Sequence, residues 1–293
     1  MAEPYRKVSY DNNSCYKLHH TYGFFAGTAN PAHLHYDTDL IITYFKQGSG
    51  KIQIEGRLYD ISEGDLVIQN PAELHRCIID DGKYHERLAL YINEAILKNF
   101  PCENTILFDA FYKREKGIGN LIPAEIVSNR GLDVLLDELL IHTRSQKSTS
   151  EILAICKIIE LLIELNEIAA PVSDIINHTV YENPVINNVL NHINEHFREK
   201  LTAEDIARHF YISKYHLSHL FKEYVGISLW DYIIFRRLLF ANELMRKGYT
   251  VEESCFQSGF SNYSNFFRLY KKHMQITPSD FKRQLTASQN LSQ

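Results

Sequence analysis

The pattern of hydrophobic and polar positions divides the chain into two kinds of region. Between residues 22 and 92, apolar residues form short runs, some continuous and some alternating with polar residues, and Gly, Asp and Pro separate the runs. This pattern predicts short β-strands. Between residues 129 and 169, and again between 184 and 287, apolar residues recur every three or four positions, which predicts helices.

Segments with strand character lie at residues 40–45, 51–55, 66–68, 77–79 and 88–92. Turn signals separate them, among them Gly48-Ser49-Gly50, Glu63-Gly64-Asp65 and Asn70-Pro71. Many short strands at a spacing of roughly ten residues are typical of a small barrel or a jelly roll. The N-terminal region is therefore expected to be a small β-barrel.

The first helical region carries two apolar stripes, which the polar residues 145–150 separate. The stripes consist of Leu132, Leu135, Leu136, Leu139 and Leu140, and of Ile152, Ile155, Ile159, Leu162 and Ile163. A helix pair cannot hide two such stripes from water by itself. The stripes are expected either to close over the barrel or to pack against a second subunit.

The second helical region contains an internal repeat, in which residues 202–232 return as residues 250–281. The matching positions include Phe221-Lys222, Gly226 and Tyr232 in the first copy, and Tyr270-Lys271, Gln275 and Phe281 in the second. The repeat predicts that one helical unit has been duplicated. Residues 229–247 between the copies are long enough for a connecting helix of about five turns.

Each copy predicts a short helix, a tight turn and a second helix. Thr202 and Thr250 have the residue type and spacing of N-caps for the short helices, and Ser213 and Ser261 are expected to cap the second helices. Gly226 is expected to end the second helix of the first copy, because Gly tolerates a positive φ. Two helices joined in this way form a helix-turn-helix.

The second helix of each copy leaves polar residues exposed in its N-terminal half, which a helix-turn-helix places against base edges in the major groove. The residues expected to contact bases are Tyr215, Ser218, His219, Tyr263, Ser264, Asn265 and Arg268. The residues expected to contact phosphates are Lys214, Lys222, Lys271 and Lys272. For any one of these residues, the alternative is an ordinary solvated helix face.

A larger set of positions between residues 184 and 283 fits one known pattern. The positions are Ile206-Ala207, residues 213–222, Gly226, Tyr232-Ile233, Arg237, Ala241, Gly259-Phe260-Ser261, Phe266, Arg268, Tyr270-Lys271, Thr277-Pro278 and Phe281-Lys282-Arg283. With them the chain resembles the AraC/XylS-type transcription regulators. The resemblance implies double-stranded promoter DNA as a partner, the base-contacting positions named above, a homodimer, contact with RNA polymerase and, in most such proteins, activation of transcription.

The strand region carries a shorter resemblance. Residues 33–75, with His33, His35, Gly50, Gly64 and His75, are similar to the cupin barrel that this regulator family often uses as a sensor. The resemblance implies a small-molecule effector in the barrel and favours a sugar or a related metabolite. The residues expected to bind the effector are His33, His35, Tyr44, His75 and Arg87.

The same histidines leave other interpretations open. Together with Asp39, which replaces the usual glutamate of metal cupins, His33, His35 and His75 could surround one transition metal ion. The second cupin motif is one residue short between Pro71 and His75, and regulatory cupins commonly lack the metal. We therefore expect no metal and no other cofactor. The alternatives are this four-residue metal site and histidines that are only structural.

Charge is divided unevenly along the 293 residues, whose formal net charge is −5. Residues 182–287 hold 14 Lys and Arg against 11 Asp and Glu, whereas the remainder holds 17 against 25. This asymmetry favours two domains with different partners, and the modest positive surplus predicts salt-sensitive DNA binding. The five cysteines are scattered and suggest neither a disulfide framework nor a metal site.

The sequence predicts an α+β multidomain protein. Residues 1–100 are expected to form a cupin-like sensing barrel, 101–170 a helical segment for dimerisation, 171–183 a linker, and 184–287 an all-α DNA-binding domain with two helix-turn-helix units. No signal peptide or membrane span is visible, which predicts a cytoplasmic protein. The expected function is a DNA-binding regulator under small-molecule control and not an enzyme. The alternatives are a regulator without an effector and a metal-dependent cupin enzyme.

Overall fold

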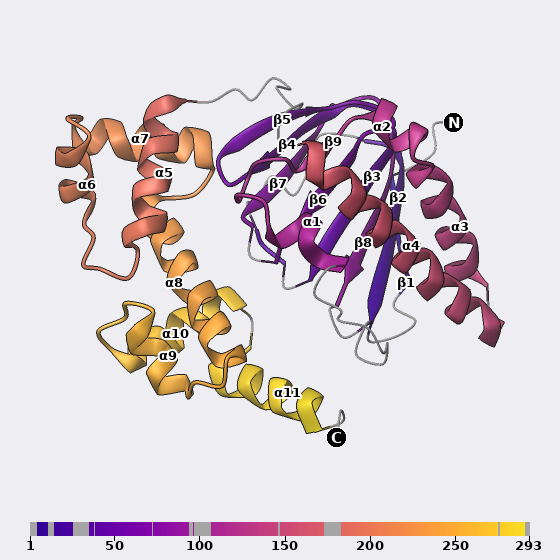
Figure 1. The fold of residues 1–293 in the computed structure, drawn as a ribbon. Helices are drawn as coiled ribbons and strands as arrows, with labels where there is room; N and C mark the ends of the chain where they lie inside the picture. Colours follow the sequence, from indigo (N-terminus) through magenta and orange to yellow (C-terminus); the bar gives the residue numbers. More distant parts are fainter. Residues whose placement is uncertain are drawn as a thin grey trace. The chain divides into compact units, whose positions relative to one another are not determined.

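The computed structural model describes residues 5–10, 15–25, 35–37, 39–71, 73–93, 96, 107–145, 147–172, 183–274 and 276–290. The chain forms two compact units, an N-terminal unit at Met1–Tyr181 and a C-terminal unit at Glu182–Gln293 (Figure 1). The expected barrel and the expected dimerisation segment thus lie in one unit. The expected linker begins inside a helix, because the last helix of the N-terminal unit extends to Val172.

Two antiparallel sheets form the core of the N-terminal unit. The larger sheet has the strand order β1-β2-β8-β3-β6-β9, and the smaller has the order β5-β4-β7. The strands are β1 (Arg6–Tyr10), β2 (Tyr16–Phe24), β3 (Leu40–Gln47), β4 (Gly50–Ile54), β5 (Arg57–Ile61), β6 (Leu66–Gln69), β7 (His75–Ile79), β8 (Tyr84–Ile92) and β9 (Leu121–Ile122). Every predicted strand is present, while β1, β2, β5 and β9 were not predicted.

The side chains of the larger sheet alternate between two faces. On β3, Leu40 and Ile42 point to an outer face that packs against helices, whereas Phe45 packs inward with Ile52 and Ile54 of the smaller sheet. The register pairs Phe45 with Arg87 on the neighbouring strand β8. The inner faces of the two sheets therefore enclose the interior of the unit.

Helices cover the outer face of the larger sheet. They are α1 (Asp109–Tyr112), α2 (Ala124–Asn129), α3 (Leu132–Arg144) and α4 (Ser148–Val172). The predicted α3 stripe is buried against the sheet. The predicted α4 stripe is confirmed only in part. Leu162 is buried and Ile155 and Ile159 pack against the core, whereas Ile152 and Ile163 are 64% and 46% exposed. The helix is apolar on several sides, so its period does not identify the buried face.

The C-terminal unit is entirely helical in its described residues. Its helices are α5 (Pro184–His196), α6 (Ala203–His209), α7 (Lys214–Val225), α8 (Leu229–Arg246), α9 (Val251–Gln257), α10 (Tyr263–Met274) and α11 (Pro278–Asn290). Helices α6 and α7 form the first helix-turn-helix, α9 and α10 form the second, and α8 connects them (Figure 1). Both predicted helix pairs and the connecting helix are present.

Local capping explains where these helices begin and end. The Thr202, Ser213 and Thr250 side chains accept hydrogen bonds from backbone N–H groups of α6, α7 and α9, as predicted. Gly226 ends α7 with a φ of 88°. The predicted cap at Ser261 is wrong, because Asn262 next to it accepts the hydrogen bond from the Asn265 backbone.

Two contacts join the halves of the C-terminal unit. The buried Arg237 of α8 donates hydrogen bonds to the carbonyls of Phe197 and Glu199 after α5, and its guanidinium lies 5.8 Å from the ring centre of Phe260 after α9. The turn at Gly259 packs so tightly that an added Cβ would lie 2.5 Å from the carbonyl oxygen of Arg198. These contacts tie the segment after α5 to α8 and to the turn of the second helix-turn-helix.

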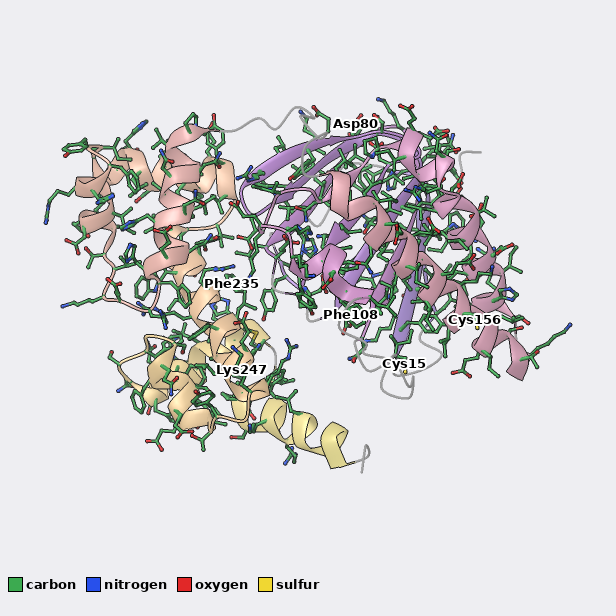
Figure 2. The ribbon with its side chains drawn as sticks, viewed as in Figure 1. Cys15, Asp80, Phe108, Cys156, Phe235 and Lys247 are labelled. Atoms are coloured by element: carbon green, nitrogen blue, oxygen red, sulfur yellow. The ribbon has the colours of Figure 1, made fainter. Side chains whose placement is uncertain are left out.

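The described residues hold four free cysteines, Cys15, Cys77, Cys156 and Cys255, of which Cys15 and Cys156 are labelled in Figure 2. Cys255 lies in the C-terminal unit and the other three in the N-terminal unit. Within the described part of the chain, no helix combines the length and the apolar composition that a membrane span requires.

Candidate functional site

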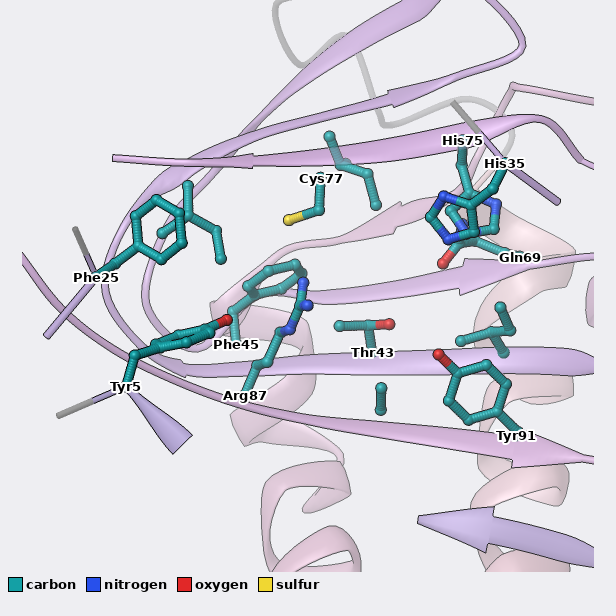
Figure 3. Close-up of a pocket in the computed structure, with 14 residues that line it drawn as sticks. Tyr5, Phe25, His35, Thr43, Phe45, Gln69, His75, Cys77, Arg87 and Tyr91 are labelled. Atoms are coloured by element: carbon teal, nitrogen blue, oxygen red, sulfur yellow. The ribbon is translucent and has the colours of Figure 1, made fainter. Parts of the chain in front are cut away.

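A pocket lies between the two sheets of the N-terminal unit (Figure 3). Its cavity volume is about 80 Å³, and the pocket is partly open to solvent. Its polar lining residues are Tyr5, His35, Thr43, Gln69, His75, Cys77, Arg87 and Tyr91, and its apolar lining residues are Phe25, Ile41, Phe45, Ile52, Ile79 and Ala89. Small-molecule sites combine apolar walls with polar groups that orient the ligand, and this pocket offers both kinds of lining.

Side chains alternate between the two faces of each strand, and this alternation determines which residues line the pocket. Arg87, Ala89 and Tyr91 point from β8 into the pocket, whereas Leu88 and Leu90 point to the helices on the other face. The same alternation on β3 turns its odd-numbered residues toward the pocket. One charged side chain thus enters an interior that is otherwise lined by neutral groups and imidazoles.

The groups around Arg87 are uncharged near neutral pH. Burial raises the pKa of the Cys77 thiol, although the neighbouring Arg87 guanidinium opposes this shift. Burial likewise raises the pKa of Tyr91 to about 12 and also raises the pKa of Tyr5. Burial, with a contribution from the charge of Arg87, lowers the pKa of His85 to about 4, so this histidine is neutral. The interior therefore disfavours charge, yet it holds a guanidinium that cannot lose its proton.

Two histidines and an aspartate meet at the other end of the pocket. His35 and His75 form an isolated β-bridge with their ring centres 4.4 Å apart. The Oδ2 atom of Asp37 lies 3.4 Å from Nε2 of His75 and 3.8 Å from Nε2 of His35. Burial alone would raise the pKa of Asp37, but the adjacent imidazoles hold it below its usual value.

This cluster contains suitable ligand atoms for a metal ion, because one atom from each of the three residues lies within 4.8 Å of the others. Imidazole nitrogens and a carboxylate suit several transition metals, and three protein ligands would leave a position open. The Nδ1 atom of His75 lies 2.9 Å from the Glu73 carbonyl, which leaves Nε2 facing Asp37. The described cluster uses Asp37 in place of the predicted Asp39.

The charge of the buried Glu73 carboxylate is compensated by hydrogen-bond donors and a cation of the N-terminal unit. The fully buried carboxylate accepts hydrogen bonds from Arg114, from the Gly117 and Asn70 backbones and from the Asn120 amide. Burial would raise the pKa of Glu73, but the charge and hydrogen bonds of Arg114 and the backbone donors lower it. This network fixes the start of β7 and with it the position of His75.

The predicted effector residues divide into three groups. His35, His75 and Arg87 line the pocket. Tyr44 does not, because it points to the outer face of β3 and packs in the core beneath the helices, so its prediction is wrong. His33 lies outside the described residues. Sequence reasoning missed Cys77, Gln69 and Tyr91, although the period of β8 from Arg87 onward indicates Tyr91.

In the C-terminal unit, the predicted base-contacting residues of α7 lie on its exposed side. Tyr215 is 83% exposed, and Ser218 and His219 are exposed as well, whereas Leu217 and Phe221 are buried in the core. His219 lies 3.8 Å from Glu223 on the next helical turn. The exposed side of α7 thus presents an aromatic ring, a hydroxyl and an imidazole.

The corresponding surface of α10 is more polar. Tyr263, Ser264, Asn265 and Arg268 are exposed, and Phe266 anchors the helix in the core. The Arg268 guanidinium donates a hydrogen bond of 2.9 Å to the Asn265 side chain, which holds both groups on one face. Guanidinium and carboxamide groups are those that pair with guanine and adenine edges in the major groove.

The predicted phosphate contacts Lys214, Lys222, Lys271 and Lys272 are all exposed. Lys214 forms an ion pair with Glu204 of α6. Lys271 and Lys272 lie in the last turn of α10, where their charge also complements the helix dipole. The lysines therefore occupy the same two helices as the predicted base contacts.

An exposed tyrosine in the first helix-turn-helix was not predicted. Tyr211, in the turn between α6 and α7, is 96% exposed and has a φ of 56°. The second copy has Gly259 at this position, with a φ of 91°. Left-handed backbone is costly for a residue with a side chain. The duplicated pattern could have identified this position, because it aligns Tyr211 with a turn glycine.

Comparison with known proteins gives two matches to family models. A model described as an AraC-like ligand binding domain matches residues 19–162. A model described as a helix-turn-helix domain matches residues 206–284. The two matches fall in different compact units and together account for both candidate sites.

Among curated relatives, the transcriptional regulatory protein HptR of Staphylococcus aureus is 31% identical over 104 residues, which are 36% of this chain and 41% of that protein. The match therefore spans less than half the length of this relative. The solved C-terminal domain of AraT, a response regulator from Geobacillus stearothermophilus, is 26% identical, with 35% of this chain and 86% of that chain covered and a TM-score of 0.34. ToxT from Vibrio cholerae is 14% identical, with 94% and 99% covered and a TM-score of 0.38.

Proposed function

Because the chain belongs to the AraC/XylS-type transcription regulators, we propose that a small molecule in the pocket of the N-terminal unit controls how α7 and α10 bind promoter DNA. The family matches identify a DNA-binding regulator with a ligand-binding domain, not an enzyme. What we propose beyond these family matches is that a small molecule controls DNA binding. Its strongest support is the pocket, which lies inside the matched ligand-binding domain.

The architecture of the C-terminal unit supports binding through two successive major grooves. The helices α7 and α10 both pack on α8, and Arg237 and Gly259 tie the two halves together. Successive major grooves on one side of B-DNA are ~34 Å apart. Two different recognition helices in one chain would read an asymmetric site, because their exposed residues differ.

The resemblance to AraC/XylS-type regulators also suggests the class of effector, the direction of control and the oligomeric state, which we include in the proposal. The effector would be a sugar or a related metabolite, and its binding would favour activation of transcription through RNA polymerase. The regulator would act in the cytoplasm as a homodimer. The exposed apolar side chains of α3 and α4, which include Ile141, Ile152 and Ile163, support a second subunit as the partner of this helical surface.

A regulator without an effector is the alternative within the same family. The pocket argues against it, because the Gln69 amide nitrogen and Arg87 Nε are buried in it and no described residue is their hydrogen-bond partner. Such groups cost stability unless a ligand satisfies them. A protein that needed no ligand would gain stability by filling this interior with apolar side chains.

Substitution of Arg268 tests the proposed mode of DNA binding. If Arg268 pairs with a guanine edge, Arg268→Ala should cost roughly 1–3 kcal/mol of binding free energy and relax the preference at one base pair. The measurement is a competition binding assay of the full chain against a library of its promoter DNA with single-base changes.

Lys222→Ala provides the matched control, because Lys222 is an exposed cation on the other recognition helix. It should weaken binding to all sequences alike and reduce the slope of log affinity against log salt by about one unit. A uniform loss for Arg268→Ala would show that Arg268 contacts only phosphate. Full affinity in both variants would remove α7 and α10 from the interface.

A further inference from the structure

Arg87 is a cation inside the pocket for which the described residues provide no paired anion. No Asp or Glu is among the described residues that line the pocket, and the largest electrostatic contributions to its guanidinium come from Cys77, Tyr5 and Tyr91. Its Nε atom is buried and has no hydrogen-bond partner among the described residues. The guanidinium interacts with the Cys77 thiol, which is neutral, so this contact leaves its charge uncompensated.

The surroundings make such a charge expensive. The same interior keeps His85 in its neutral form and the Tyr91 phenol protonated. A buried charge is normally paired, and arginine cannot escape the cost by releasing its proton. Elsewhere in the same unit, the buried Glu73 has Arg114 as its partner. Because no carboxylate among the described residues pairs with this guanidinium, it is suited to the anionic group of a ligand.

The opposite end of the pocket offers a second polar group. The Gln69 amide nitrogen is buried there, next to His35 and His75, and has no hydrogen-bond partner in the part of the chain that the structure describes (Figure 3). Gln69 pairs with Ile41 across the sheet, and Arg87 pairs with Phe45, four residues further along β3. At about 3.4 Å per residue the two backbone positions differ by ~14 Å along the strands, and because β6 and β8 flank β3 they differ by about two strand spacings of ~4.8 Å across the sheet, so they are ~17 Å apart. The long Arg87 side chain shortens the gap between the polar ends.

We infer that the effector is a small organic monocarboxylate, whose carboxylate pairs with Arg87 while a hydrogen-bond acceptor at its other end accepts from Gln69. The inference rests on the proposed function, because it names the chemistry of the effector that the pocket takes. The apolar middle of the pocket, with Phe45 and Ile52, would contact the body of the molecule. A sugar acid or an aromatic hydroxy acid has this arrangement of groups, whereas a neutral sugar lacks the anion.

A carboxylate fits better than a phosphate ester. A single guanidinium presents two parallel N–H donors that match one carboxylate. A phosphate dianion carries more charge, and Arg87 is the one Lys or Arg among the described residues that line the pocket. The Asp37 carboxylate at the far end would further repel a dianion. The two kinds of anion can be separated by experiment.

The test measures the thermal unfolding midpoint of the full chain with matched pairs of compounds at millimolar concentration. The pairs are 4-hydroxybenzoate and 4-hydroxybenzamide, glucuronate and glucose, and 6-hydroxyhexanoate and 6-hydroxyhexanamide, with glucose 6-phosphate as the phosphate arm. A ligand that binds the folded state raises the midpoint in proportion to its affinity. At least one carboxylate should raise the midpoint more than its uncharged counterpart and more than the phosphate ester.

Variants assign the effect to Arg87. In Arg87→Met the affinity for the carboxylate should fall roughly 10- to 100-fold, as expected for a lost hydrogen bond to a charged group, while Arg87→Lys should retain part of it. Arg76→Met is the matched control, because Arg76 lies on β7 next to Cys77 but does not line the pocket. This control should bind the carboxylate as the unmodified protein does.

Without ligand, Arg87→Met should unfold at the same or a higher temperature, because it removes an unpaired buried charge. The inference is overturned if no carboxylate exceeds its uncharged counterpart, if the phosphate ester binds more tightly, or if Arg87→Met binds the carboxylate normally. A neutral compound that binds tightly and alters DNA affinity would overturn the inference and leave the proposed function intact. The proposed function itself fails if the full chain does not bind promoter DNA.

Discussion

The C-terminal unit and the N-terminal unit each withdraw an arginine from water, but the two arginines have different partners. Arg237 donates to two backbone carbonyls at the end of α5, at 2.6 and 2.7 Å. Arg87 lies in the pocket with neutral neighbours and a buried Nε atom that has no partner among the described residues. A buried guanidinium whose acceptors come from its own chain holds elements together, whereas one without such acceptors is suited to a ligand.

Arg237 and Arg87 differ because of the partners of their charges and not because they lie in different units. Glu73 shows this, because it is a fully satisfied charge in the same unit as Arg87. Substitution of each of these charged residues tests whether its partner determines its contribution to stability. Trp230 on α8 is the single tryptophan of the chain, so its fluorescence reports the unfolding of the C-terminal unit alone.

Glu73→Gln should cause the largest loss, about 4 kcal/mol of unfolding free energy, because it leaves the buried Arg114 charge without its partner. Urea unfolding followed by circular dichroism, in the transition that Trp230 does not report, measures it. Asp60→Asn on β5 is the control, because Asp60 is exposed and its ion pair with Lys51 is a surface pair. A loss below 1 kcal/mol for Glu73→Gln would contradict the distinction.

The same residue predicts an acid dependence. The folded state lowers the pKa of Glu73 below its ordinary value of 4.5, so the unfolded state binds more protons in this range. The stabilisation is present above about pH 4.5 and is lost as the pH falls through the lower pKa of the folded state. Glu73→Gln should flatten this part of the stability profile, and an unchanged profile would assign the acid sensitivity to other groups.

Arg237→Met should rank second, with a loss of about 3 kcal/mol, because two buried carbonyls lose a charged donor. The loss should appear in the urea transition that Trp230 fluorescence reports. Arg246→Met on the same helix is the control, since Arg246 is exposed and should change stability by less than about 0.5 kcal/mol. Equal effects of Arg237→Met and Arg87→Met on their own units would remove the contrast between the two arginines.

Tyr211→Gly should have the smallest effect and the opposite sign. It should raise the stability of the C-terminal unit by about 1 kcal/mol, because glycine adopts positive φ without steric cost. Gly259→Ala at the equivalent turn should instead destabilise, since the added Cβ meets the backbone of Arg198. If Tyr211→Gly also weakens DNA binding, Tyr211 is a strained residue kept for contact with DNA. Unchanged binding would make it a solvent-exposed turn residue.

The C-terminal fold could be predicted because its signals are local. Caps at Thr202 and Ser213 and the stop at Gly226 depend on residues within one helical turn, and the duplication provided each signal twice. The one error, Ser261 in place of Asn262, is a shift of one residue between two good capping side chains. Interactions between residues close in the sequence were therefore sufficient to predict the fold of the C-terminal unit.

The pocket could be predicted only in part because its signals are long-range. The run from Leu40 to Phe45 is apolar at most positions, because both faces of β3 are buried, so it gave no sign that Tyr44 points away from the pocket. The cluster at Asp37 exists because His35 pairs with His75, residues far apart in the sequence. No local pattern identifies that pairing. The sequence identified Arg87 as a candidate effector-binding residue. Only the three-dimensional structure shows that no carboxylate among the described pocket residues pairs with it.

The close approach of Gly259 to Arg198 also affects how the two copies of the repeat can diverge. A side chain at position 259 would meet the backbone of Arg198, so a substitution there would strain the fold whatever its effect on DNA binding. Position 211 faces solvent and has already accepted a tyrosine. After the duplication, the first copy was thus free to acquire new side chains at its turn, and the second copy was not.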